Sequence, residues 1–207
     1  MGRVRRRLLL VVLGGALLGL VAPSQANGAG CRTPSGYTLK ERSSEARIFL
    51  RKDGRKAYGC LLSTGRLVRV GVVNRYWLSG RYVAYRVYYY EGEGEALTTL
   101  FIRDLKTGQN LRREDPWVPP DFTGDPPPGQ VTDLTMKRNG SLAWISCLAA
   151  ANGLSCEPGE PYQVWRVDRG GGERLEHSTE VKPRSLERSD SKITWIVGDS
   201  IRSATLR

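Results

Sequence analysis

The chain has 207 residues, 32 of them basic and 21 acidic, and a formal net charge of +11 at neutral pH. It contains one histidine, His177, so a serine or cysteine nucleophile would have a single imidazole to activate it. Lysine and arginine are dispersed among aspartate and glutamate rather than clustered, and this dispersion argues against nucleic acid as a partner.

The first 26 residues have the pattern of an export signal. Arginines crowd the first seven positions, an apolar run follows at 8–21, and small residues end the pattern at Ala26. The apolar run is shorter than the roughly 20 residues that a bilayer-spanning helix needs. We therefore predict a signal peptide at 1–26 and a secreted or otherwise extracytoplasmic mature chain. After signal removal we expect no transmembrane segment.

The chain has four cysteines: Cys31, Cys60, Cys147 and Cys156. An even number in an exported chain predicts disulfides, and the absence of a C-x-x-C spacing argues against zinc. Three pairings are possible. Cys147 and Cys156 flank a short loop between two strand-like runs, so their pairing is the easiest, and it leaves Cys31 for Cys60. The alternative for Cys31 is acylation, because residues 28–31 form a degenerate lipobox.

The clearest structural pattern lies at 79–113 and predicts three antiparallel strands. A run rich in valine and tyrosine at 81–90 is followed by a glycine-containing loop, a second run at 98–104, a turn, and a short strand at 110–113. Side chains on both faces of the first run are largely apolar, whereas a strand exposed on one face would alternate apolar with polar residues. We therefore expect this sheet to be covered on both faces.

Weaker copies of this pattern predict one domain over 37–207, after a leader at 27–36. The four repeats are expected at about 37–71, 72–113, 131–177 and 181–207. Trp144 and Trp195 fall at equivalent points of two repeats, as residues of a core between sheets do. Short strands repeating at this spacing favour an all-β, β-propeller-like fold of about four blades with three to four antiparallel strands each, as a small or open ring. The alternative is another β-sandwich or barrel.

The pattern of a turn, an apolar strand and an Asp-x-x-x-Gly turn, seen at 104–108 and 168–172, resembles the blades of TolB-like periplasmic propellers. The chain is also similar to exported proteins of high-GC bacteria that end in Arg-Ser-Ala-Thr-Leu, as residues 202–206 do. The resemblance implies a propeller-like fold, but the separate amino-terminal domain and the larger blade number of TolB-like proteins are missing. We therefore do not infer that this chain binds the partner of TolB-like proteins. An open ring would leave two end faces that a homodimer could cover.

A proline-rich loop at 114–130 interrupts the repeats, and its composition excludes helix and central strand. Long loops in compact domains are often functional, and Trp117 and Phe122 are the candidate binding residues. The alternative is that both rings fold back to cap the neighbouring blade. The spacing of Asp115, Asp121 and Asp125 does not match a calcium-binding loop, so we predict no metal.

The sequence contains no motif of a catalytic nucleophile or phosphate-binding loop, and none for a cofactor. We therefore expect a non-enzymatic binding or scaffold protein of the bacterial cell envelope, with a protein or an envelope polymer as partner. The alternative is a binder of cell-wall carbohydrate or polyanion through exposed tyrosine and arginine. A less favoured alternative is a hydrolase that depends on a pair of carboxylates.

Overall fold

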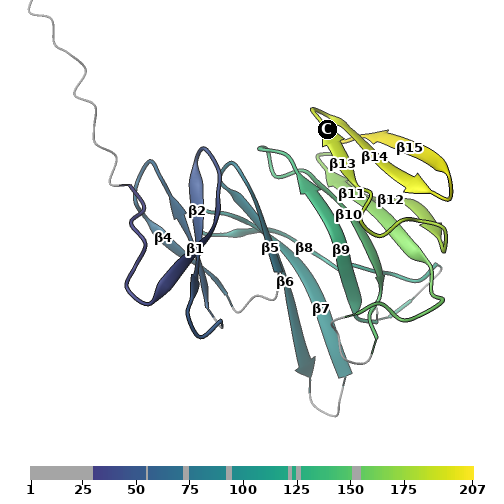
Figure 1. Ribbon diagram of the computed structural model, residues 1–207, viewed down its shortest axis with the longest axis horizontal. Helices are drawn as coiled ribbons and strands as arrows, with labels where there is room; N and C mark the ends of the chain where they lie inside the picture. The colour runs from purple at the N-terminus through teal and green to yellow at the C-terminus, as the bar shows by residue number, and fades with distance from the viewer. Residues whose placement is uncertain are drawn as a thin grey trace, which may run out of the picture.

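The structure is a computed structural model that describes residues 30–54, 56–71, 75–91, 95–120, 123–124, 127–150 and 155–207; within 75–120, side chains are described outside 89–97. In these residues all regular structure is β, with fifteen strands in four antiparallel sheets and no helix (Figure 1). The predicted signal peptide at 1–26 lies outside the described residues. No helix in the part that is described is long and apolar enough to cross a membrane.

Within every sheet the strands are neighbours in chain order. Sheet 1 contains β1 Tyr37–Arg42, β2 Ala46–Arg51, β3 Ala57–Leu61 and β4 Leu67–Gly71. Sheet 2 contains β5 Arg75–Ser79, β6 Tyr82–Glu91, β7 Glu95–Asp104 and β8 Asn110–Glu114. Sheet 3 contains β9 Gly129–Met136, β10 Leu142–Leu148, β11 Tyr162–Asp168 and β12 Gly171–Ser178. Sheet 4 has three strands, β13 Glu187–Ser189, β14 Lys192–Val197 and β15 Ser200–Thr205.

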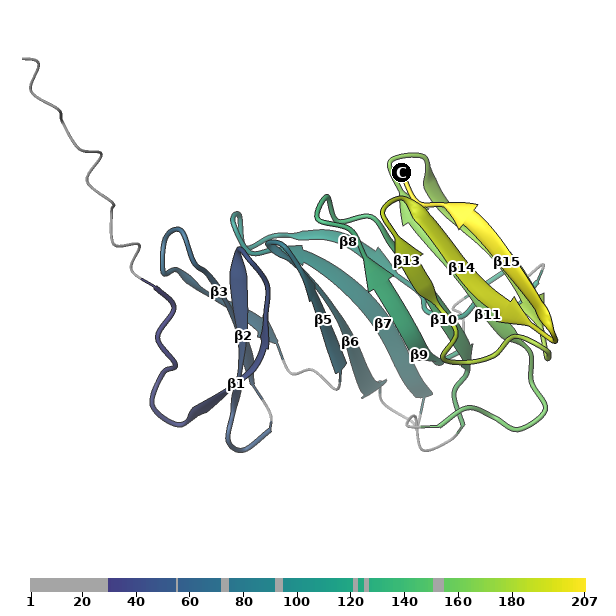
Figure 2. The same cartoon turned by 45° about the horizontal axis from the view of Figure 1, so that its top comes forward.

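The four sheets stand face to face in a row along the long axis of the molecule (Figures 1 and 2). Three buried apolar clusters join sheet 1 to sheet 2, sheet 2 to sheet 3, and sheet 3 to sheet 4. No such cluster joins sheet 4 back to sheet 1 in the described part of the chain. The prediction of an all-β, propeller-like fold of about four small antiparallel sheets is confirmed, in its open form.

Strand β6 shows why the chain stacks its sheets. Val83 and Tyr85 on one face pack into the cluster with sheet 1, while Tyr82 and Ala84 on the other face pack into the cluster with sheet 3. A strand with two apolar faces removes both from water only when another layer covers each side, and burial of apolar area is the main favourable term in folding. The interpretation of this strand as covered on both faces is confirmed.

Tryptophans fill the two clusters on either side of sheet 3. Trp144 is almost fully buried against sheet 2, where its ring stacks 6.0 Å from that of Trp165. Trp195 of β14 is buried in the cluster between sheets 3 and 4. Both rings thus belong to the cores between sheets, as their equivalent positions predict.

Both expected disulfides are present, Cys31–Cys60 and Cys147–Cys156. The first fixes the leader onto the outward face of sheet 1, where Phe49 is fully buried beneath it. The carbonyl of Cys31 also accepts a hydrogen bond of 2.7 Å from Arg47 Nη1. Disulfide-bonded Cys31 has no free thiol in this structure.

Candidate functional site

The first strands of the sheets, β1, β5, β9 and β13, share one edge of the stack, called here the first-strand edge. Strand β1 contacts β5, and β5 contacts β9 along it. A cavity of about 310 Å³ lies on this edge and is lined by all four strands. The residues of this central cavity are Glu41, Trp77, Leu78, Ser79, Leu134, Thr135, Met136 and Arg188. In propellers the innermost strands surround a central channel, and the cavity occupies the corresponding place.

The central cavity combines an apolar wall with one acid and one base. Burial raises the pKa of the Glu41 carboxyl, although a hydrogen bond from the backbone of Leu78 opposes the shift. Arg188 is exposed and donates a 2.8 Å hydrogen bond to the carbonyl of Asp190. Within the described residues Glu41 and Arg188 form no ion pair with each other. Both charged groups therefore keep capacity to contact a ligand.

A second cavity, of about 280 Å³, opens between sheets 2, 3 and 4. We call it the arginine cavity; it is lined by Arg75, Gln130, Thr132, Ser155, Cys156, Tyr162, Pro183 and Arg184. Arg75 begins β5, Gln130 and Thr132 lie on β9, Tyr162 begins β11, and Arg184 precedes β13. Sheets 2 and 3 and the segment before sheet 4 therefore contribute to its wall.

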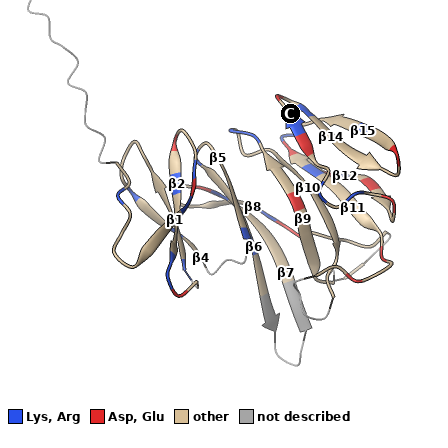
Figure 3. Ribbon diagram, viewed as in Figure 1, with Lys and Arg blue, Asp and Glu red and all other residues tan. Residues whose placement is uncertain are grey.

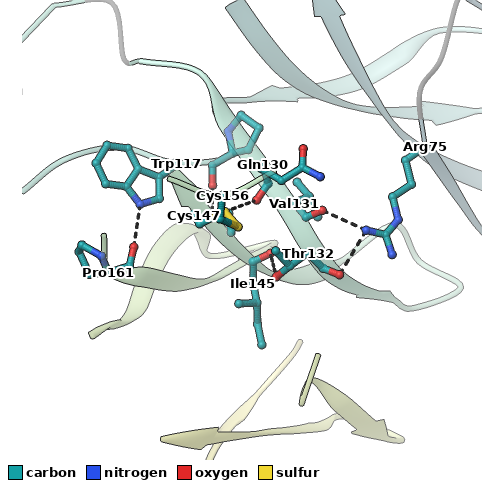
Figure 4. The surroundings of a disulfide bond; sticks show 11 residues. Arg75, Trp117, Gln130, Val131, Thr132, Ile145, Cys147, Cys156 and Pro161 are labelled. Carbon is teal, nitrogen blue, oxygen red and sulfur yellow. Dashed lines mark hydrogen bonds between the residues drawn. A yellow bond between two sulfur atoms is a disulfide. The ribbon is translucent and has the colours of Figure 1, made fainter. Parts of the chain in front are cut away.

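Arg75 is held in a defined orientation at this cavity (Figure 4). Its Nη1 donates to the carbonyls of Val131, at 3.1 Å, and Thr132, at 3.2 Å. Its guanidinium carbon also lies 5.1 Å from the ring centroid of Trp77, within the range of a cation–π contact. Because Trp77 lines the central cavity, Arg75 and Trp77 connect the two cavities along β5.

The proline-rich loop is fixed to sheet 3 near the arginine cavity. The carbonyl of Pro116 accepts a 2.8 Å hydrogen bond from Trp144 Nε1 and a second from the hydroxyl of Ser146. Trp117 is 5% exposed, and its Nε1 donates to the carbonyl of Pro161 at 3.4 Å (Figure 4). The loop therefore helps to position 161–162 at the cavity wall.

Of the two predicted binding residues, Trp117 is in the interior of the protein and Phe122 lies outside the described residues. The buried Trp117 ring fits the alternative that it caps a neighbouring sheet. Contact between a ligand and Trp117 would require this part of the loop to move, and the binding role of the pair stays a prediction. Asp121 and Asp125 are likewise outside the described residues.

No motif in the sequence indicates the residues of the arginine cavity. Arg75, Gln130 and Arg184 are each separated by more than fifty positions. Only the stacking of sheets 2 and 3 against the segment before β13 brings them together, so no spacing in the sequence points to them.

Among the described residues no three His, Cys, Asp or Glu side chains gather closely enough to hold a metal ion. Both signs of charge are distributed over the sheets, as the blue and red segments of Figure 3 show.

A third cavity, of about 530 Å³, lies at sheet 4 and is larger than the two described above. Its wall is formed by residues 182–185, Glu187, Thr194, Trp195, Ile196 and Ile201, so it shares Pro183 and Arg184 with the arginine cavity. Comparison of the chain with models of known protein families, and with curated proteins, finds no match.

Proposed function

We propose that the protein is an exported, non-enzymatic binding or scaffold protein of the bacterial cell envelope that holds its ligand at the first-strand edge. The pattern at 1–26 supports export, and so do the two disulfides, because disulfides persist in oxidising compartments. The kinship with TolB-like propellers stays part of this proposal and rests on the turn pattern of the repeats.

One observation carries the choice of site. The central cavity is the place where all four sheets contribute side chains to one concavity, and it offers an aromatic ring, a carboxyl and a guanidinium on apolar walls. Ligand sites in proteins are typically concave and carry a few convergent polar groups. The central cavity has both features, whereas the Trp117 ring is buried.

The second candidate, a binder of carbohydrate or polyanion, is favoured by the arginine cavity. Arg75 and Arg184 bring two cationic groups to one opening together with hydroxyl and amide groups. Guanidinium groups bind carboxylates and phosphates in charge-assisted pairs, and envelope polymers carry such anions. An anionic polymer is therefore the preferred partner over a protein.

The experiment is a co-sedimentation of the mature chain, residues 27–207, with purified envelope fractions. Arg188→Glu reverses the charge in the central cavity, and Arg169→Glu makes the same change at an exposed turn away from both cavities. We expect the parent and Arg169→Glu to be retained and Arg188→Glu to be retained several-fold less. Failure of the parent to bind any envelope fraction would contradict the proposal.

A homodimer stays a separate prediction. Analytical ultracentrifugation of the mature chain at micromolar concentration decides it, and a monomer at all concentrations would remove it.

A further inference from the structure

We propose that the arginine cavity binds a carboxylate-bearing sugar, that is, one uronic acid unit of an envelope polymer. The inference deepens the proposed function and rests on it for the source of the ligand. Hydrogen-bonding groups at the cavity support it, because the described protein atoms leave part of their capacity unused.

Arg75 presents a fork for a carboxylate. Nη1 is occupied by the carbonyls of Val131 and Thr132, and neither Nε nor Nη2 has a hydrogen-bond partner among the described residues. These two nitrogens form the side edge of the guanidinium, and their N–H groups are parallel. A carboxylate meets that edge with two parallel hydrogen bonds. Because Nη1 and the Trp77 contact hold the group in place, little side-chain entropy remains to be lost on binding.

Arg184 adds a second cation from the segment between β12 and β13, which lines both this cavity and the cavity at sheet 4. It is exposed and makes no hydrogen bond or ion pair with the described residues. Two like charges that line one cavity repel each other, and an anion bound between them offsets that repulsion. The arrangement therefore favours an anionic group on the ligand.

Thr132 specifies what accompanies the anion. Its Oγ1 donates to the carbonyl of Ile145 at 3.2 Å and keeps only acceptor capacity, which a carboxylate, itself only an acceptor, cannot satisfy. The Oε1 of Gln130 is enclosed by protein atoms, so a ligand in the cavity does not reach it. The ligand needs a hydroxyl donor close to its anion.

A sugar acid meets both requirements in one unit. It carries a planar carboxylate for the fork of Arg75 and a hydroxyl group for Thr132. The Tyr162 ring, which also lines the cavity, offers an apolar surface to the C–H groups of the sugar. The volume of about 280 Å³ lies near the lower end of the range for ligand sites, roughly 300–1,000 Å³, so the cavity suits one unit rather than several.

The test is isothermal titration calorimetry of the mature chain with sodium D-glucuronate. D-glucose, which lacks the anion, and glycerol phosphate, which replaces the carboxylate with a phosphate, are the comparison ligands. We expect glucuronate to bind at least about tenfold more tightly than either comparison ligand. Equal or tighter binding of glycerol phosphate would overturn the assignment to a carboxylate and point to a phosphate-bearing polymer instead.

Two variants locate the site. Arg184→Ala should weaken glucuronate binding by about tenfold or more, since it removes one charge-assisted contact, whereas the control Arg169→Ala should not change it. Thr132→Val should weaken binding to a similar degree, because it removes the hydroxyl acceptor and keeps the shape of the side chain. Unchanged binding in both variants would overturn the proposal.

The outcomes also separate this inference from the proposed function. Retention of the parent by envelope fractions without glucuronate binding would refute the sugar-acid site alone. If glucuronate competes with envelope fractions for the parent but not for Arg184→Ala, both stand. Loss of envelope retention altogether would refute the proposed function, whatever glucuronate does.

Discussion

The two end sheets of the stack differ in how far their outward faces are covered. On sheet 1 the outward face is covered by the leader, which Cys31–Cys60 ties down, and Phe49 beneath it is fully buried. On sheet 4 the outward face has no such cover among the described residues, and Ile201 is 74% exposed.

The difference follows from which side chains point outward. Sheet 1 presents a large aromatic ring that must be removed from water, and the leader does so. On sheet 4, Ile193 and Trp195 point inward to the core. The outward face carries the polar pair Thr194–Ser203 and the exposed apolar pair Ile196–Ile201. One end is therefore covered by a covalently attached segment, and the other leaves an apolar pair exposed beside polar side chains.

The largest loss of stability is expected from truncating the buried ring at the covered end of the stack. Phe49→Ala should lower the free energy of unfolding by about 3–5 kcal/mol, because it removes a buried ring and leaves a cavity beneath the leader. Urea denaturation followed by circular dichroism measures it. A loss below about 1 kcal/mol would show that the leader does not cover this face in solution.

Releasing the leader should have the next largest effect. The double substitution Cys31→Ala and Cys60→Ala opens a disulfide with a sequence separation of 29 and should cost about 3–4 kcal/mol. Cys147→Ala with Cys156→Ala is the matched control; it opens a separation of 9 and should cost about 1 kcal/mol less. The reverse order would contradict the role given to the leader.

The central cavity should give a smaller effect that depends on pH. The pKa of Glu41 is raised by burial in the folded protein, so the folded state holds its proton more tightly than the unfolded state. The parent therefore loses stability as pH rises through the window above the ordinary carboxyl pKa, where the folded state must bury the charge. Glu41→Gln does not titrate and should be more stable than the parent at pH 7, by less than about 1 kcal/mol after solvent screening. Thermal unfolding at pH 3.5 and pH 7 checks the sign, because the gain should vanish at the lower value.

The smallest effect is expected at the uncovered end. Ile201→Ser should change the free energy of unfolding by no more than about 0.5 kcal/mol, as is usual for exposed positions. The same urea denaturation provides the value. A loss comparable with that of Phe49→Ala would mean that a partner or a second copy covers this face in solution.

Features that neighbouring residues encode can be predicted from the sequence, whereas features formed by residues far apart in the chain cannot. The apolar faces of β6 and the loop between Cys147 and Cys156 are local, and both were predicted from neighbouring residues. The sequence does not decide between an open and a closed ring, because closure depends on how the last sheet meets the first. Nor does it indicate the arginine cavity, because Arg75 on β5 and Arg184 in the segment before β13 are far apart in the chain and lie in no motif.

The proposed ligand binds at the first-strand edge rather than at the uncovered end. Amide chemical-shift mapping of the mature, isotope-labelled chain during titration with solubilised envelope polymer distinguishes the two places. The predicted result is that the perturbed amides concentrate in β1, β5 and β9, while those of β14 and β15 do not shift. Perturbations confined to the outward face of β14 and β15 would contradict the claim.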